Sequence, residues 1–197
     1  MKRTKYEIVK KHTNNMSILW KECRGIAPDS VADKMDDAML RWMVELTETL
    51  SIWIERGNCL TDGELILART NMGALVESWL KFFYCAFYED YMKNPKIERG
   101  KIIEPNKLSF EQLKEFSVGI LWKDKSDSMY KWVDKIQHYR NAIHAFNYRD
   151  IGTAIEFIND MDIFYDYVEM ILKKIPSVED YLEYYPIGYD INPYYAD

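Results

Sequence analysis

Long apolar runs are missing from this 197-residue chain. A membrane-spanning helix needs roughly 18 or more consecutive apolar residues, and no such run occurs. The charged residues 1–7 are not followed by the apolar segment of an export signal. We therefore expect a protein that neither spans a membrane nor is exported, and that works in the cytoplasm.

Cysteine is scarce as well. Cys23, Cys59 and Cys85 are odd in number and widely spaced, and two of them have apolar or helical neighbours. This pattern favours reduced thiols over a disulfide framework, which agrees with a cytoplasmic setting.

The motifs of common cofactor sites are also missing. Neither a Gly-x-Gly-x-x-Gly fingerprint nor a Gly-Lys-Ser phosphate loop occurs, so we expect no ordinary dinucleotide or nucleoside triphosphate site. The chain has no Cys-x-x-Cys pair, no His-Glu-x-x-His motif and no Glu-x-x-His pair of the di-iron bundle type. We expect no cofactor and no metal.

Positive charge is in deficit, since the formal net charge is −6. Phosphate contacts require Lys and Arg at the interface, which argues against a large nucleic-acid surface. Residues 121–150 are an exception, with six Lys and Arg against four Asp, a net charge of +2, and with His138 and His144 in addition. Any RNA site is therefore expected to be local.

The apolar pattern predicts an all-α protein. In the segments between the Gly and Pro residues, apolar side chains recur with a period of 3.6 residues rather than 2. The length of 197 residues suits one domain with one core. The expected helices cover residues 6–23, 29 or 30–56, 61 or 62–93, 109–120, 126 or 127–146 and 150–175. Residues 72–88 are apolar nearly all round, so the helix of residues 61–93 is expected to be the central one.

Both ends of the chain have a distinct composition. Residues 1–27 form a basic N-terminal arm or helix. Residues 178–197 are rich in tyrosine and acidic side chains and contain no basic residue. This tail either packs along the bundle through its rings or serves as a strip that docks a partner or covers a site.

The segment with the clearest chemistry is Arg140-Asn141-Ala142-Ile143-His144. At 100° per residue Arg140 falls within the apolar stripe of a helix, whose other members are Met129, Val133, Ile136 and Ile143. A guanidinium on an apolar face must be paired or must face a cleft, because an unpaired buried charge is costly. In a continuous helix, the spacing of four residues places Arg140 and His144 side by side, where both can address one phosphate.

Such a pair suits RNA cleavage without a metal. A histidine that titrates near neutrality takes a proton from a ribose 2′-hydroxyl or gives one to the leaving 5′-oxygen. A neighbouring guanidinium stabilises the charge that develops at phosphorus.

The Arg-Asn-x-x-His string at the end of a penultimate helix, in a bundle of two long antiparallel helices followed by shorter ones, resembles the HEPN superfamily. The likeness in residues covers 71–81 and 132–153, although the gap between Arg140 and His144 is shorter than in the superfamily's usual motif. The resemblance implies a metal-independent endoribonuclease of toxin or phage-defence type. It also implies a homodimer whose two motif helices line one cleft.

By position, the resemblance gives Arg140 a phosphate-binding role, Asn141 an orienting role and His144 the role of acid or base, with Glu77 as a supporting acidic residue. Another interpretation stays open. Arg140 is then a buried ion-pair partner of Glu77 or another carboxylate, Glu77 pairs with Lys81, and His144 is a helix-end histidine. The protein is then a non-catalytic interaction module of a toxin–antitoxin or defence system.

Overall fold

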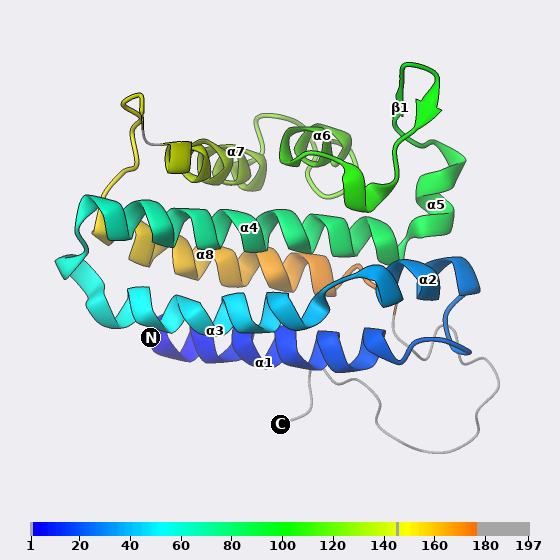
Figure 1. Ribbon diagram of the computed structural model, residues 1–197, viewed down its shortest axis with the longest axis horizontal. Helices are drawn as coiled ribbons and strands as arrows, with labels where there is room; N and C mark the ends of the chain where they lie inside the picture. Colours follow the sequence, from blue (N-terminus) through cyan, green and yellow to red (C-terminus); the bar gives the residue numbers. More distant parts are fainter. Residues whose placement is uncertain (1, 145, 177–197) are drawn as a thin grey trace.

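The structure is a computed structural model, which describes residues 2–144 and 146–176. This part of the chain is mostly helical and has one small hairpin of two strands (Figure 1). Its α-helices are α1 (Lys2–Lys21), α2 (Asp29–Asp37), α3 (Leu40–Arg56), α4 (Asp62–Ala86), α5 (Tyr88–Lys93), α6 (Phe110–Phe116), α7 (Ser128–Arg140) and α8 (Ala154–Leu172). The strands are β1 (Ile97–Glu98) and β2 (Lys101–Ile102), and the 3-10 helices are η1 (Gly57–Cys59), η2 (Pro105–Lys107) and η3 (Asn141–His144).

The helices form layers around α4. In Figure 1, α1 and α3 lie side by side on one edge, α4 and α8 form the middle, and α6 and α7 cover the opposite side of α4. Helix α4 packs against α3, α7 and α8, and α1 packs against α3 and α8. The expected all-α class is confirmed for this part of the chain, apart from the hairpin.

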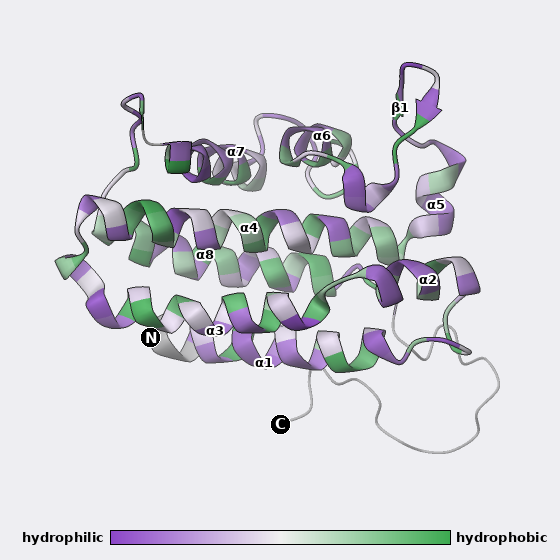
Figure 2. Ribbon diagram, in the orientation of Figure 1, coloured by the Kyte–Doolittle hydropathy of each residue, from purple (hydrophilic) through white to green (hydrophobic). Residues whose placement is uncertain are grey.

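The predicted central helix is confirmed as α4. It starts with a capping box, in which the Thr61 side chain accepts from the Glu64 backbone N–H and the Glu64 side chain accepts from the Thr61 N–H. From Leu75 onward its buried residues point in all directions around the axis. Aromatic rings dominate the core, as the edge-to-face contact of Trp79 with Phe82 illustrates. Figure 2 shows the apolar colouring along α4 and α8.

Two predicted long helices are each broken in two. The helix predicted over residues 29–56 stops after Asp37, because Ala38 has an extended backbone with ψ of 135°, and restarts at Leu40. Along a straight helix, the buried faces of α2 and α3 differ by roughly a quarter of a turn, so the break lets both faces meet the core. Met39 and Trp42, which lie on the continuation of the buried face of α2, are therefore 61% and 62% exposed.

The second break lies in the helix predicted over residues 61–93. Phe87, with φ of −101° and ψ of 37°, separates α4 from α5. The turn lets Tyr91 of α5 pack against Phe116 of α6, with ring centroids 5.3 Å apart. The predicted end at Asn94 is confirmed. The connection that follows, predicted only as polar, contains the hairpin β1–β2.

The boundaries of the last three helices also differ from the prediction. Ser109 and Asp127 are the N-caps of α6 and α7, as expected, but α6 ends at Phe116. Helix α7 ends at Arg140, so the motif continues as the 3-10 helix η3. Helix α8 is capped by Thr153, three residues after the predicted start, because Thr153 forms a capping box with Glu156.

The N-terminal arm is helical, as α1. Cys23, Cys59 and Cys85 are free thiols, as predicted. The tyrosine-rich tail, residues 178–197, lies outside the described residues. Among the helices that the structure describes, none is long and apolar enough to cross a membrane.

Candidate functional site at the end of helix α7

Arg140, the last residue of α7, is held by Glu77 of α4. Its Nη1 lies 2.7 Å from Glu77 Oε2, and the two side chains are 32% and 12% exposed. The other oxygen of Glu77 lies 2.9 Å from Lys81 Nζ. Glu77 therefore faces two cations, and this group of three side chains carries one net positive charge.

The side-chain stem of Arg140 packs on the backbone of α4. A Cβ atom added to Gly73 would lie 2.6 Å from Arg140 Cβ and 2.9 Å from its Cγ. The missing side chain at Gly73 therefore allows α7 to approach α4 at this point. The guanidinium carbon of Arg140 also lies 5.8 Å from the ring centroid of Phe110, within cation–π distance.

His144 is exposed and leaves the helix face that carries Arg140. The expected adjacency of the two residues required a continuous α-helix, in which four residues rotate a side chain by about 40° beyond a full turn. Along a 3-10 helix the corresponding rotation is about 120°. The structure thus brings Arg140 to Glu77, and the change from α7 to η3 replaces the continuous α-helix on which the expected adjacency of Arg140 and His144 depended. Asn141 is half-buried and caps α7 through its backbone N–H, which donates to Gln137 O.

The segment after η3 exposes two aromatic rings. Phe146 is 97% and Tyr148 is 94% exposed, and Ile143 before them is 41% exposed. His144 and Arg149, which flank the two rings in sequence, are exposed too. We call Ile143, His144, Phe146, Tyr148 and Arg149 the loop patch.

A hollow adjoins the loop patch, with a volume of about 380 Å³. Its lining comes from the start of α4, from η3 and from the loop, and consists of Asp62, Ile66, Ala142 and residues 147–152. Exposed rings are costly to keep in water, so such a patch commonly marks a contact site.

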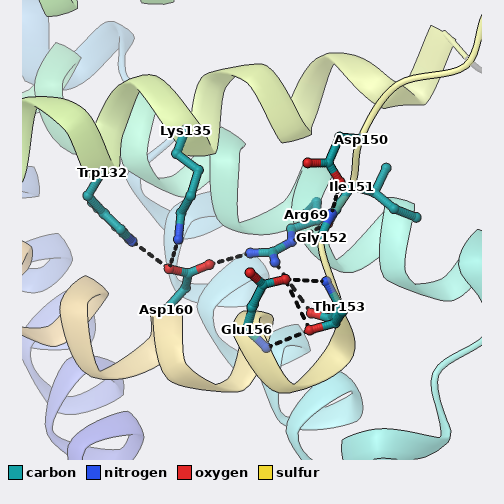
Figure 3. A network of polar contacts seen from close by, with 9 residues as sticks. All are labelled: Arg69, Trp132, Lys135, Asp150, Ile151, Gly152, Thr153, Glu156 and Asp160. Carbon is teal, nitrogen blue, oxygen red and sulfur yellow. Dashed lines mark hydrogen bonds and ion pairs between the residues drawn. The ribbon is translucent and has the colours of Figure 1, made fainter.

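A buried polar network fixes the chain just beyond the loop patch (Figure 3). Arg69 of α4 is fully buried, and its Nη1 lies 2.5 Å from Asp160 Oδ2 of α8. Asp160 Oδ1 also accepts from Trp132 Nε1 at 2.9 Å and from Lys135 Nζ at 2.5 Å. The network therefore ties α4, α7 and α8 together.

Arg69 also holds the loop itself. Its Nε donates to Ile151 O at 3.2 Å, and its guanidinium carbon lies 4.4 Å from the ring centroid of Tyr139. Burial raises the pKa of the Tyr139 phenol, as do the nearby carboxylates Asp150 and Glu156. The loop is thus fixed at residues 151–153, while Phe146 and Tyr148 project into solvent.

Sequence reasoning missed Arg69 and Asp160. Both lie within the helices predicted over residues 61–93 and 150–175, but the sequence analysis gave neither of them a role. One signal was present, because Arg69 falls on the same helix face as Leu65, Ala68 and Met72. A guanidinium there requires a buried carboxylate.

Charge is unevenly distributed along the fold. Residues 91–150 contain twelve Lys and Arg and eight Asp and Glu, a net charge of +4, so the remaining residues carry −10. In Figure 1 this stretch forms α6, α7, the hairpin and the loop patch, which all lie on one side of α4. That side is the favoured one for an anionic partner.

The described residues, 2–144 and 146–176, contain no group of three or more His, Cys, Asp or Glu placed to hold a metal ion. Comparison of the chain with protein families, with curated proteins and with solved structures finds no match.

Proposed function

We propose that the protein binds single-stranded RNA at the loop patch and cleaves it without a metal. The observation that carries the proposal is the exposure of Phe146 and Tyr148, at 97% and 94%, between the exposed side chains of His144 and Arg149. Aromatic rings stack on unpaired bases, and neighbouring cations bind the phosphates between them. The net positive side of the fold supports the same partner.

The proposed reaction is transesterification at phosphorus. The ribose 2′-oxygen attacks the phosphorus and loses its proton to one His144, while the leaving 5′-oxygen takes a proton from a second acid. The products are a 2′,3′-cyclic phosphate and a 5′-hydroxyl. Arg140, one-third exposed beside Glu77, binds the phosphate, and Asn141 orients it.

A second copy of the chain completes this site. One chain has a single His144, and the turn of η3 carries it away from its own Arg140, so the acid and base are proposed to come from the two subunits of a homodimer. The resemblance to HEPN proteins supports this arrangement and a cytoplasmic role in toxin or phage-defence systems. Light scattering at micromolar concentration tests the dimer, and a strict monomer would contradict the composite site.

The chemistry is tested with labelled single-stranded RNA in the presence of EDTA. We expect cleavage of RNA but not of DNA, with cyclic phosphate ends. His144→Ala should lower the rate at least about 100-fold, as expected on loss of a general acid or base. His138→Ala is the matched control, because His138 is an exposed histidine of α7 outside the loop patch. Equal activity of the wild-type protein and His144→Ala would refute the assignment.

A second candidate is a non-catalytic interaction module, as part of a toxin–antitoxin or defence system. The observation that favours it is the Arg140–Glu77 ion pair, with the Arg140 stem packed on Gly73, because both contacts suit a structural arginine. Failure of the wild-type protein to cleave varied RNAs, including tRNA, would favour this candidate over the ribonuclease.

A further inference from the structure

The hairpin β1–β2 has an unusual turn. Glu98 pairs with Lys101, so its loop consists of Arg99 and Gly100 alone, and both have positive φ, at 51° and 76°. Two-residue turns of this kind favour Asn, Asp or Gly at the first position, where a larger side chain is strained. Arginine is therefore a poor choice for the turn itself, and such strain often accompanies function.

The cations of the hairpin are available to a ligand. Lys96, Arg99 and Lys101 are all exposed. Among the described residues, none of the three has an ion pair with a carboxylate within 4.0 Å. Ile97 and Ile102 form the other cross-strand pair and are 59% and 48% exposed, so apolar surface accompanies the positive charge.

The base of the hairpin is fixed to the fold. Tyr91 of α5 donates a hydrogen bond to Ile103 O at 2.5 Å and accepts one from the Lys96 backbone N–H at 3.1 Å. On the side of α6, Gln112 Nε2 donates to Glu98 at 3.3 Å. The cations are thus presented from a defined position, which lowers the entropic cost of binding.

The hairpin and the loop patch rise on the same side of the fold, at opposite ends of α4, with α6 and α7 between them (Figure 1). Helix α4 has 25 residues, so the two sites are separated by about 37 Å at a rise of 1.5 Å per residue. Exposed Lys123 and Lys131 lie in the segments between them. A stacked single strand, at about 3.4 Å per nucleotide, would need roughly ten nucleotides to join the two sites.

We propose that the hairpin is a second RNA-binding element. The substrate is then an extended single strand that runs from the loop patch across α7 and α6 to Arg99 and Lys101. This inference rests on the proposed function, because it takes RNA as the ligand of the loop patch. It adds the length and the path of the RNA.

The test measures binding of 2′-O-methylated oligouridine, which cannot be cleaved by attack of a 2′-hydroxyl, by fluorescence anisotropy over a series of salt concentrations. The probes have about 20 and about 6 nucleotides, lengths above and below the estimated span. The test variant combines Arg99→Asn and Lys101→Gln, and Asn suits the positive φ of the turn. The control variant combines Lys21→Gln and Arg41→Gln, two exposed cations of α1 and α3.

For the longer probe, the logarithm of the binding constant falls linearly with the logarithm of the salt concentration. In the test variant we expect this line to be shallower by about 1.4, or roughly 0.7 for each cation removed. With equal binding of the variant and the wild type at 1 M salt, this change in slope corresponds to about 25-fold weaker binding of the variant at 0.1 M salt. The test variant should bind the shorter probe as tightly as the wild type does, and the control variant should bind both probes like the wild type. The thermal stability of both variants should equal that of the wild type.

Three results would overturn the inference in distinguishable ways. Unchanged slopes in the test variant, with tight RNA binding retained, would refute RNA binding by the hairpin but not the proposed function. Absence of binding to both probes would refute both the hairpin site and the proposed function. Binding of polyglutamate through Arg99 and Lys101, without RNA binding, would assign the hairpin to an acidic protein partner.

Discussion

Gly73 lies where the end of α7 packs against α4, and its replacement by alanine tests that packing, because the close contact reverses the usual change in stability. At a solvent-exposed position within a helix, Gly→Ala raises stability by up to about 1 kcal/mol. At Gly73, however, the new Cβ would meet Arg140 Cβ at 2.6 Å, an atom that cannot move without the backbone of α7. Overpacking of this kind costs about 1 to 3 kcal/mol. We therefore expect a net loss of up to about 2 kcal/mol.

The matched control for this substitution is Gly63→Ala, in the first turn of α4, where nothing lies within 4 Å of the added Cβ. This variant should be as stable as the wild type or more stable by up to about 1 kcal/mol. Thermal unfolding measures both, and the Gly73→Ala midpoint should fall by a few degrees, at about 2 to 4 °C per kcal/mol. Stabilisation by both substitutions would refute the close approach of α7 to α4.

Three further predictions concern charge and burial. Asp160→Asn removes the charge that balances buried Arg69, so urea titration should show a loss of about 3 kcal/mol or more, and an unchanged midpoint would contradict the network. Arg140→Ala should lower the free energy of unfolding by roughly 1 to 4 kcal/mol in thermal melts, and the exposed His144→Ala by less than about 0.5 kcal/mol. Equal losses would contradict the ion pair of Arg140 with Glu77. Cys59 alone should react quickly with a thiol reagent at neutral pH, because burial raises the pKa of both other thiols; uniform reactivity would indicate an open core.

The helix ends that depend on local sequence were predictable. Asn94 ends α5, Ser109 caps α6 and Asp127 caps α7, because each signal acts within one turn of its own position. The breaks at Ala38 and Phe87 have no such signal, since neither Gly nor Pro occurs there. They follow from the directions in which neighbouring helices bury their faces, which depend on the whole fold.

The same distinction applies to the site. The Arg140–Glu77 pair was one of the alternatives that the sequence left open, and the structure contains it. The partner of Arg69 was not predictable, because Asp160 is 91 residues away in sequence. The change from α7 to η3 moved His144 off the expected face, and the exposed rings of the loop patch became visible only in three dimensions.

The central claim, that the loop patch binds single-stranded RNA, is tested most directly by removing its rings. The affinity for a labelled, uncleavable single-stranded RNA is measured for the wild type, for Phe146→Ala with Tyr148→Ala, and for Trp42→Ala, which removes an aromatic ring that is 62% exposed on α3. Stacking contributes about 1 to 3 kcal/mol per base, so the double variant should bind at least about 10-fold more weakly, while Trp42→Ala binds like the wild type. Equal affinities of the double variant and the wild type would contradict the claim.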